Sequence, residues 1–99
     1  MTNPKIWFIT DSSRGFGRAL TEAALRKGDV VIATARNPKS LAGLVETYRD
    51  RIYPLALDVS DESAVSQAVE EAKSRYGCLD VVVNNAGYGD IAVRTGMLL

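Results

Sequence analysis

Runs of apolar residues alternate with segments of helical periodicity along this chain. Three runs rich in β-branched residues, at 5–10, 30–35 and 79–83, predict strands, and we expect the first of them to be buried on both faces. A fourth run at 52–57 contains Pro54, and because proline cannot donate to a central ladder we expect this strand at the edge of the sheet.

Between these strands, apolar positions recur at the spacing of one helix face over about 14–27, 38–48 and 61–76. In the first helix the predicted buried face comprises Phe16, Ala19, Leu20, Ala23, Ala24 and Leu25. Gly28 is a C-terminal stop, and Asn37 and Ser60 are the predicted N-caps of the second and third helices. Strands that alternate with helices predict an α/β fold with a parallel sheet and right-handed crossovers.

The last ten residues differ in pattern from the rest of the chain. Residues 90–99 show neither helical nor strand periodicity. We therefore expect one domain over residues 1–89, followed by an aberrant or frayed tail over 90–99.

Composition removes several classes of function. The 99 residues carry 12 Lys and Arg against 12 Asp and Glu, without a basic run, so nucleic acid and anionic membranes are not expected partners. With no His and a single cysteine, Cys78, the chain lacks a disulfide, a Cys/His metal site and a Ser-His-Asp triad. No apolar segment is long enough to span a bilayer, and we expect a cytoplasmic protein.

A glycine-bearing turn joins the first strand to the first helix. This order places backbone N–H groups and the positive end of the helix dipole where a phosphate can bind, and Gly15 and Gly17 allow close approach. Glycines also occur in any tight turn between a strand and a helix, so the turn alone leaves both interpretations open.

Three segments together are more specific. Thr10-Asp11-Ser12-Ser13-Arg14-Gly15-Phe16-Gly17, Asp58-Val59 and Asn84-Asn85-Ala86-Gly87 resemble, in order and spacing, the amino-terminal half of the short-chain dehydrogenase/reductase family. The implied fold is half of a Rossmann doubly wound parallel sheet, βαβαβαβ, with strand order 3-2-1-4.

The resemblance also implies roles for individual residues. Ser12, Ser13, Arg14, Gly15, Phe16 and Gly17 would wrap the phosphates of a dinucleotide, Asp58 and Val59 would contact its adenine, and Asn85, Ala86 and Gly87 would lie beside its ribose. The structural alternatives are a helix-side turn residue for Asp58 and a cap of the strand ends for Asn84.

Charge near the end of the second strand indicates which cofactor is bound. An acid there would bond the ribose 2′-OH of NAD, but this chain has Ala35 and Arg36. Arg36 and Arg14 together suit a 2′-phosphate, so we predict NADP(H) in preference to NAD(H); the alternative is that both arginines are only solvated surface residues. Asp11 occupies the position of the family's first glycine, and we expect its carboxylate to weaken cofactor binding.

The catalytic elements of the family are missing from this sequence. The family uses a Ser and a Tyr-x-x-x-Lys pair, and no tyrosine here is followed by lysine four residues later. We expect an NADP(H)-binding portion of an oxidoreductase for an alcohol or carbonyl, truncated, with no catalytic or metal residues and inactive alone. Its fourth strand would then present an open edge for self-association. The alternatives are a non-enzymatic nucleotide-binding or self-association module, and a non-functional remnant.

Overall fold

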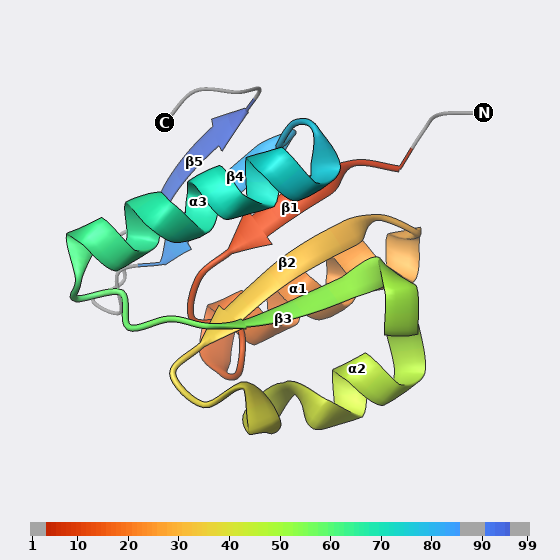
Figure 1. Ribbon diagram of the computed structural model, residues 1–99. Coiled ribbons are helices and arrows are strands. Elements are labelled where there is room, and N and C mark those ends of the chain that lie inside the picture. The colour runs from red at the N-terminus through yellow and green to blue at the C-terminus, as the bar shows by residue number, and fades with distance from the viewer. Residues whose placement is uncertain (1–3, 86–90, 96–99) are drawn as a thin grey trace.

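A sheet with helices on both faces forms the centre of the molecule (Figure 1). The computed structural model describes residues 4–85 and 91–95, and the side chains of residues 4–84. Within these residues the strands are β1 (Ile6–Ile9), β2 (Val30–Ala35), β3 (Ile52–Ala56), β4 (Val81–Asn85) and β5 (Ile91–Thr95).

The strand order is β3-β2-β1-β4-β5, and the first four strands are parallel. This confirms the predicted α/β fold and its 3-2-1-4 order. Ile9 pairs with Ala33 of β2 and Val83 of β4, so the carboxyl ends of these three strands meet at one edge of the sheet. β3 lies at the outer side of β2, where the missing N–H of Pro54 costs no ladder bond.

β5 departs from the sequence prediction. It pairs antiparallel with β4, from Val81 opposite Thr95 to Asn85 opposite Ile91. The expectation of an irregular tail is therefore wrong for 91–95, and the edge of β4 that we expected to be open for self-association is covered. An antiparallel partner needs only a short connection, whereas a parallel partner needs a crossover of roughly a dozen residues or more.

The helices begin and end close to the predicted residues. They are α1 (Gly15–Lys27), α2 (Ala42–Tyr48) and α3 (Glu62–Tyr76), with short 3₁₀ turns η1 (Pro38–Leu41) and η2 (Arg49–Arg51) on either side of α2. Gly28 ends α1 with φ +104°, and the Asn37 side chain accepts the N–H of Lys39. Among the described residues, no helix combines the length and the apolar character needed to cross a membrane.

The N-cap of α3 is one residue later than predicted. The Asp61 carboxylate accepts the N–H of Ala64 at 3.1 Å, so Asp61 caps this helix. Ser60 lies before the cap, and its hydroxyl turns back toward Asp58. Both residue types are favoured N-caps, and the exit of the chain from β3 decides between them.

Two apolar clusters lie on opposite faces of the sheet. Ile9, Val31 and Val83 point toward α1 and the η1–α2 segment, where they pack with Leu25 and Leu41. Phe8, Ile32 and Val82 point toward α3, where they pack with Val69 and Leu79. Successive side chains along a strand point to opposite faces of the sheet. Because both faces are covered by helices, neighbouring residues in these strands are apolar.

Phe16, Ala19 and Ala23 are exposed and do not belong to the core that we predicted for the first helix. Phe16 is 53% exposed, whereas α1 buries Gly17, Thr21, Ala24 and Leu25. These buried positions follow the i, i+4, i+7, i+8 pattern, and Phe16 lies about 100° away from Gly17 around the helix.

Candidate functional site

The turn between β1 and α1 requires its glycine at position 17. A Cβ on Gly17 would lie 2.1 Å from the carbonyl oxygen of Asp11, so the helix packs directly on the backbone of the turn. In the same turn, Asp11 and Gly15 adopt left-handed backbone conformations, with φ angles of +53° and +60°. The family's glycine position occupied by Asp11 is thus a true left-handed position, which Asp tolerates better than most residues.

Hydrogen bonds from buried polar side chains stabilise this turn and the start of α1. The buried Ser12 hydroxyl donates to the carbonyl of Ile9 at 2.8 Å, and the Ser12 N–H donates to the carbonyl of Thr34 at 2.8 Å. The Thr21 hydroxyl donates to the carbonyl of Gly17 at 2.7 Å. The side chain of Ser12 therefore supports the turn and does not face the solvent.

The N-terminus of α1 is left open. Its N-cap, Arg14, is extended and makes no capping hydrogen bond through its side chain, and the first turn contains no acid. The N-terminus of α3 differs, because Asp61 caps it and Glu62 lies in its first turn. The first turn of α1 thus keeps backbone N–H groups and the positive end of its dipole for an external anion.

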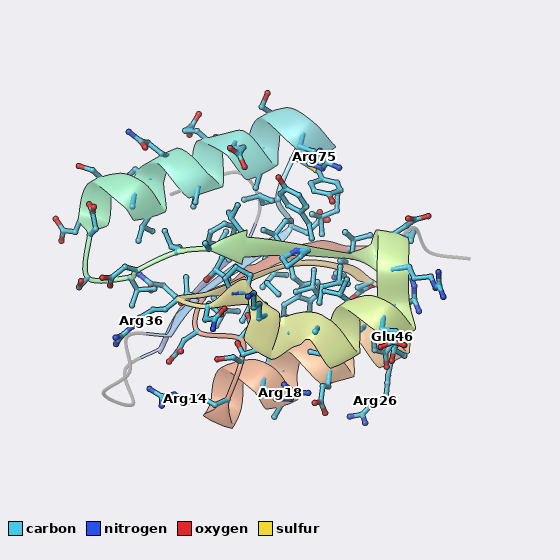
Figure 2. All side chains as sticks on the ribbon, turned by 60° about the horizontal axis from the view of Figure 1, so that its bottom comes forward. Arg14, Arg18, Arg26, Arg36, Glu46 and Arg75 are labelled. Atoms are coloured by element: carbon cyan, nitrogen blue, oxygen red, sulfur yellow. The ribbon has the colours of Figure 1, made fainter. Side chains whose placement is uncertain are left out.

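A cleft of about 700 Å³ lies at the carboxyl edge of the sheet. It brings together four of the predicted residues, Arg14, Arg36, Asp58 and Val59. Its other lining residues are Asp11, Ala35, Leu57, Ser60, Glu62, Val65, Ser66 and Asn84. Arg14 and Arg36 reach the cleft from different elements and lie at the same end of the molecule, far from Arg26 and Glu46 (Figure 2).

The remaining predicted residues lie outside this lining. Ser13 is half-buried, and Gly15 and Phe16 are exposed. Asn85 is the last residue of β4 and pairs with Ile91. Ala86 and Gly87 lie outside the described residues.

Sequence reasoning missed several lining residues that the topology could have supplied. Ala35 ends β2, Leu57 follows β3, and Asn84 lies near the end of β4. In parallel sheets the residues at the carboxyl ends of the strands surround the ligand crevice. The predicted strand order was therefore sufficient to identify these positions as lining residues. Asn84 also accepts a hydrogen bond from the Thr10 hydroxyl at 3.4 Å, which joins β4 to the end of β1.

Neither arginine of the cleft forms an ion pair with a carboxylate of residues 4–84. Within residues 4–84 the ion pairs are Arg18 with Glu22 at 2.8 Å and Lys73 with Glu70 at 3.6 Å. Arg14 and Arg36 therefore present their guanidinium groups without a carboxylate within 4.0 Å. An uncapped helix N-terminus beside two unpaired guanidinium groups fits a ligand with several phosphate charges.

Asp58, one of the acidic residues that line the cleft, has a pKa below its ordinary value. The hydrogen bonds from the Ser60 hydroxyl and then from the Ser60 N–H lower the pKa of the Asp58 carboxyl, and burial opposes them. The positive charge of Arg36 lowers this pKa further. Asp58 is thus a carboxylate at neutral pH and an acceptor of hydrogen bonds only.

Comparison with known proteins gives consistent matches. The family model described as short chain dehydrogenase matches residues 5–97. Oxidoreductase BOA17 of Botryotinia fuckeliana is 55% identical over 89 residues, and the 3-oxoacyl-[acyl-carrier-protein] reductase FabG of Haemophilus influenzae is 37% identical over 83 residues. The matched regions cover 89% and 84% of this chain.

A solved structure shows the same arrangement of elements. The short-chain dehydrogenase from Streptomyces avermitilis superposes with a TM-score of 0.82 and 45% identity over 85% of this chain. The match covers 31% of that structure, and the curated relatives are covered to 32% and 34%, so the chain spans about a third of their length. On the family match over residues 5–97, this chain belongs to the short-chain dehydrogenase family, whose members bind nicotinamide dinucleotide cofactors.

Proposed function

We propose that this chain is the NADP(H)-binding portion of an oxidoreductase that acts on an alcohol or carbonyl group. The observation that carries the proposal is the pair of unpaired guanidinium groups, Arg14 and Arg36, on one cleft. A planar guanidinium offers paired N–H donors to a phosphate, and NADP(H) differs from NAD(H) by the phosphate on its ribose 2′ oxygen.

Different residues around the cleft would bind different parts of the cofactor. The open first turn of α1, with Ser13 to Gly17, would bind the pyrophosphate. Arg36 follows β2 and would bind the 2′-phosphate, because an acid at the end of this strand, which would bond a free 2′-OH, is absent. Asp58 and Val59 would contact the adenine, and Asn85 to Gly87 would lie near the nicotinamide ribose.

The nicotinamide supplies the hydride chemistry when the cofactor is bound. The 99 residues carry no Tyr-x-x-x-Lys pair for proton transfer to or from the substrate oxygen. We therefore assign this chain the binding step, and we expect it to bind cofactor without turning over an alcohol or carbonyl substrate.

Asp11 would oppose this binding. Its side chain lines the same cleft as Arg14 and Arg36. A carboxylate about 4 Å from a phosphate charge costs roughly 4 kcal/mol at an effective dielectric constant near 20, before relaxation and before Arg14 offsets part of it. Asp11→Asn removes this charge and keeps a residue that tolerates the left-handed backbone, so its affinity for NADPH should rise at least about tenfold. An unchanged dissociation constant would contradict this role.

The test is a calorimetric titration of the chain with NADPH and with NADH at one fixed salt concentration. We expect NADPH to bind about tenfold or more tightly than NADH, which corresponds to about 1.4 kcal/mol. Arg36→Ala should remove most of this preference. Arg26→Ala is the matched control, because Arg26 is an exposed arginine in the last turn of α1, away from the cleft. Equal affinity for the two cofactors, or an equal effect of both substitutions, would refute the assignment.

A further inference from the structure

Among the strands that the structure describes, β3 is the last one at its side of the sheet, so its outer edge has no neighbouring strand (Figure 1). Residues 52–57 comprise a tyrosine, a proline and four aliphatic residues, without a charge. Solvent reaches this strand, since Tyr53 and Leu55 are half-buried and Ala56 is exposed. Uncharged segments of such composition pair readily with strands of other chains when they lie at an edge.

The register of the sheet determines which backbone groups of β3 face outward. In a parallel ladder each residue directs its N–H and C=O to the same neighbouring strand, and the next residue directs both to the opposite side. The N–H of Leu57 donates to the carbonyl of Ala35 on β2 at 3.0 Å. Tyr53 and Leu55, which precede Leu57 by four and two residues, therefore also face β2. The outward positions of the strand are Ile52, Pro54 and Ala56.

Two of these three outward positions offer no hydrogen-bond donor. The N–H of Ile52 already donates to the carbonyl of Arg49 in η2. Pro54 has no N–H at all. Ala56 therefore keeps the remaining outward N–H of β3, and within the described residues no hydrogen bond is made to it. A further strand would need a donor from every second residue of β3, and this edge supplies one at a single position.

We propose that Pro54 prevents a strand from a second copy of this chain from pairing with the outer edge of β3. Pro54 lies at the middle of the three outward positions, where a missing donor interrupts a new ladder most. Any other residue at position 54 would create two successive outward donors, at 54 and 56, on an uncharged apolar strand. The role is independent of the nucleotide site, because residues 52–56 do not line the cleft.

The test replaces Pro54 in the full chain and measures self-association. Pro54→Thr restores the N–H and introduces a polar side chain that favours strands. We expect the association constant, measured by sedimentation velocity over a range of protein concentrations, to rise about tenfold or more above that of the wild type. This is the effect of one or two added hydrogen bonds. Pro54→Ala restores the same N–H with a smaller side chain and should act in the same direction.

Ala56→Thr is the matched control. It introduces the same side chain at an exposed outward position of β3 but adds no N–H, so its association constant should stay close to that of the wild type. The double variant Pro54→Thr/Ala56→Pro moves the missing donor by two residues and again leaves one outward donor. It should return the association constant to the wild-type level, which a general effect of losing Pro54 on stability would not do.

Amide exchange distinguishes strand pairing from other forms of association. In Pro54→Thr the amide at position 54 should exchange more slowly with deuterium as the protein concentration rises, because a paired N–H is protected. The proposal is overturned if Pro54→Thr and Pro54→Ala associate no more strongly than the wild type, or no more than Ala56→Thr. It is also overturned if the double variant stays associated, or if association leaves exchange at position 54 unchanged.

Discussion

Gly17 allows the sharpest test of how the loop after β1 is built. Replacing it by alanine places a Cβ 2.1 Å from the Asp11 carbonyl oxygen, 2.9 Å from the Asp11 carbonyl carbon and 3.1 Å from the Thr10 carbonyl oxygen. Carbon atoms pack best at about 3.5–4.0 Å, so the turn must move by about 1 Å or more. All three atoms belong to the backbone, which has less freedom to move away than the end of a side chain.

The magnitude follows from two opposing effects. Overpacking of this kind costs about 3 kcal/mol, at the upper end of its usual range, while alanine in a helix gains up to about 1 kcal/mol over glycine. The net loss in the free energy of unfolding is about 2 kcal/mol. For a domain of this size that lowers Tm by roughly 8–16 °C.

The assay is thermal unfolding followed by far-UV circular dichroism. Gly43→Ala is the control, because Gly43 lies in α2 and a Cβ there has no atom within 4 Å, so its Tm should stay the same or rise. A Tm for Gly17→Ala at or above that of the wild type would show that the helix does not rest on the turn as described.

Three further predictions concern stability. Thr34→Val should raise the free energy of unfolding by about 1 kcal/mol, because the Thr34 hydroxyl is buried without a hydrogen-bond partner; a lower midpoint in urea would contradict this. Trp7→Phe should lower it by about 2 kcal/mol, because the indole N–H donates at 2.9 Å to Asp29, which is 4% exposed; an unchanged urea midpoint would count against that bond. The folded-state pKa of Asp58 is lowered, so its stabilising effect exists above its ordinary value of 3.8 and is lost as the pH falls through the folded value. The stability difference between the wild type and Asp58→Ala should therefore shrink in acid, and a difference that grows would refute the sign.

The sequence alone predicted the elements whose signals are local. Short runs rich in apolar residues predicted β1 to β4, and glycines at 28 and 77 marked the ends of α1 and α3. The order of the first four strands followed from the resemblance to the family pattern, and the structure confirms it.

What the sequence did not predict depends on distant contacts or on a choice between equivalent neighbours. β5 exists through its pairing with β4, and five residues without clear periodicity carry no sign of that partner. Ser60 and Asp61 are equally good N-caps, so only the path of the chain after β3 determines which one binds Ala64 and which one binds Asp58.

The candidate site shows the same division. Arg14, Arg36 and Asp58 follow strands or precede a helix, and the topology of a parallel sheet brings such positions to one edge. Val65 lies further along, in α3, and Ser60 lines the cleft because α3 packs across the sheet. Their presence follows from the packing of a helix on a face, which periodicity does not specify.

The turn after β1 is tied down on both sides before any ligand arrives. Ser12 joins it to the ends of β1 and β2, and Gly17 lets the first turn of α1 rest on the Asp11 carbonyl. Ligand binding should therefore involve little change in the backbone here, and its free energy should not be spent on ordering a mobile segment. Because the turn is preorganised, we expect a fragment no larger than a single nucleotide to bind with a free energy per non-hydrogen atom close to that of the whole dinucleotide.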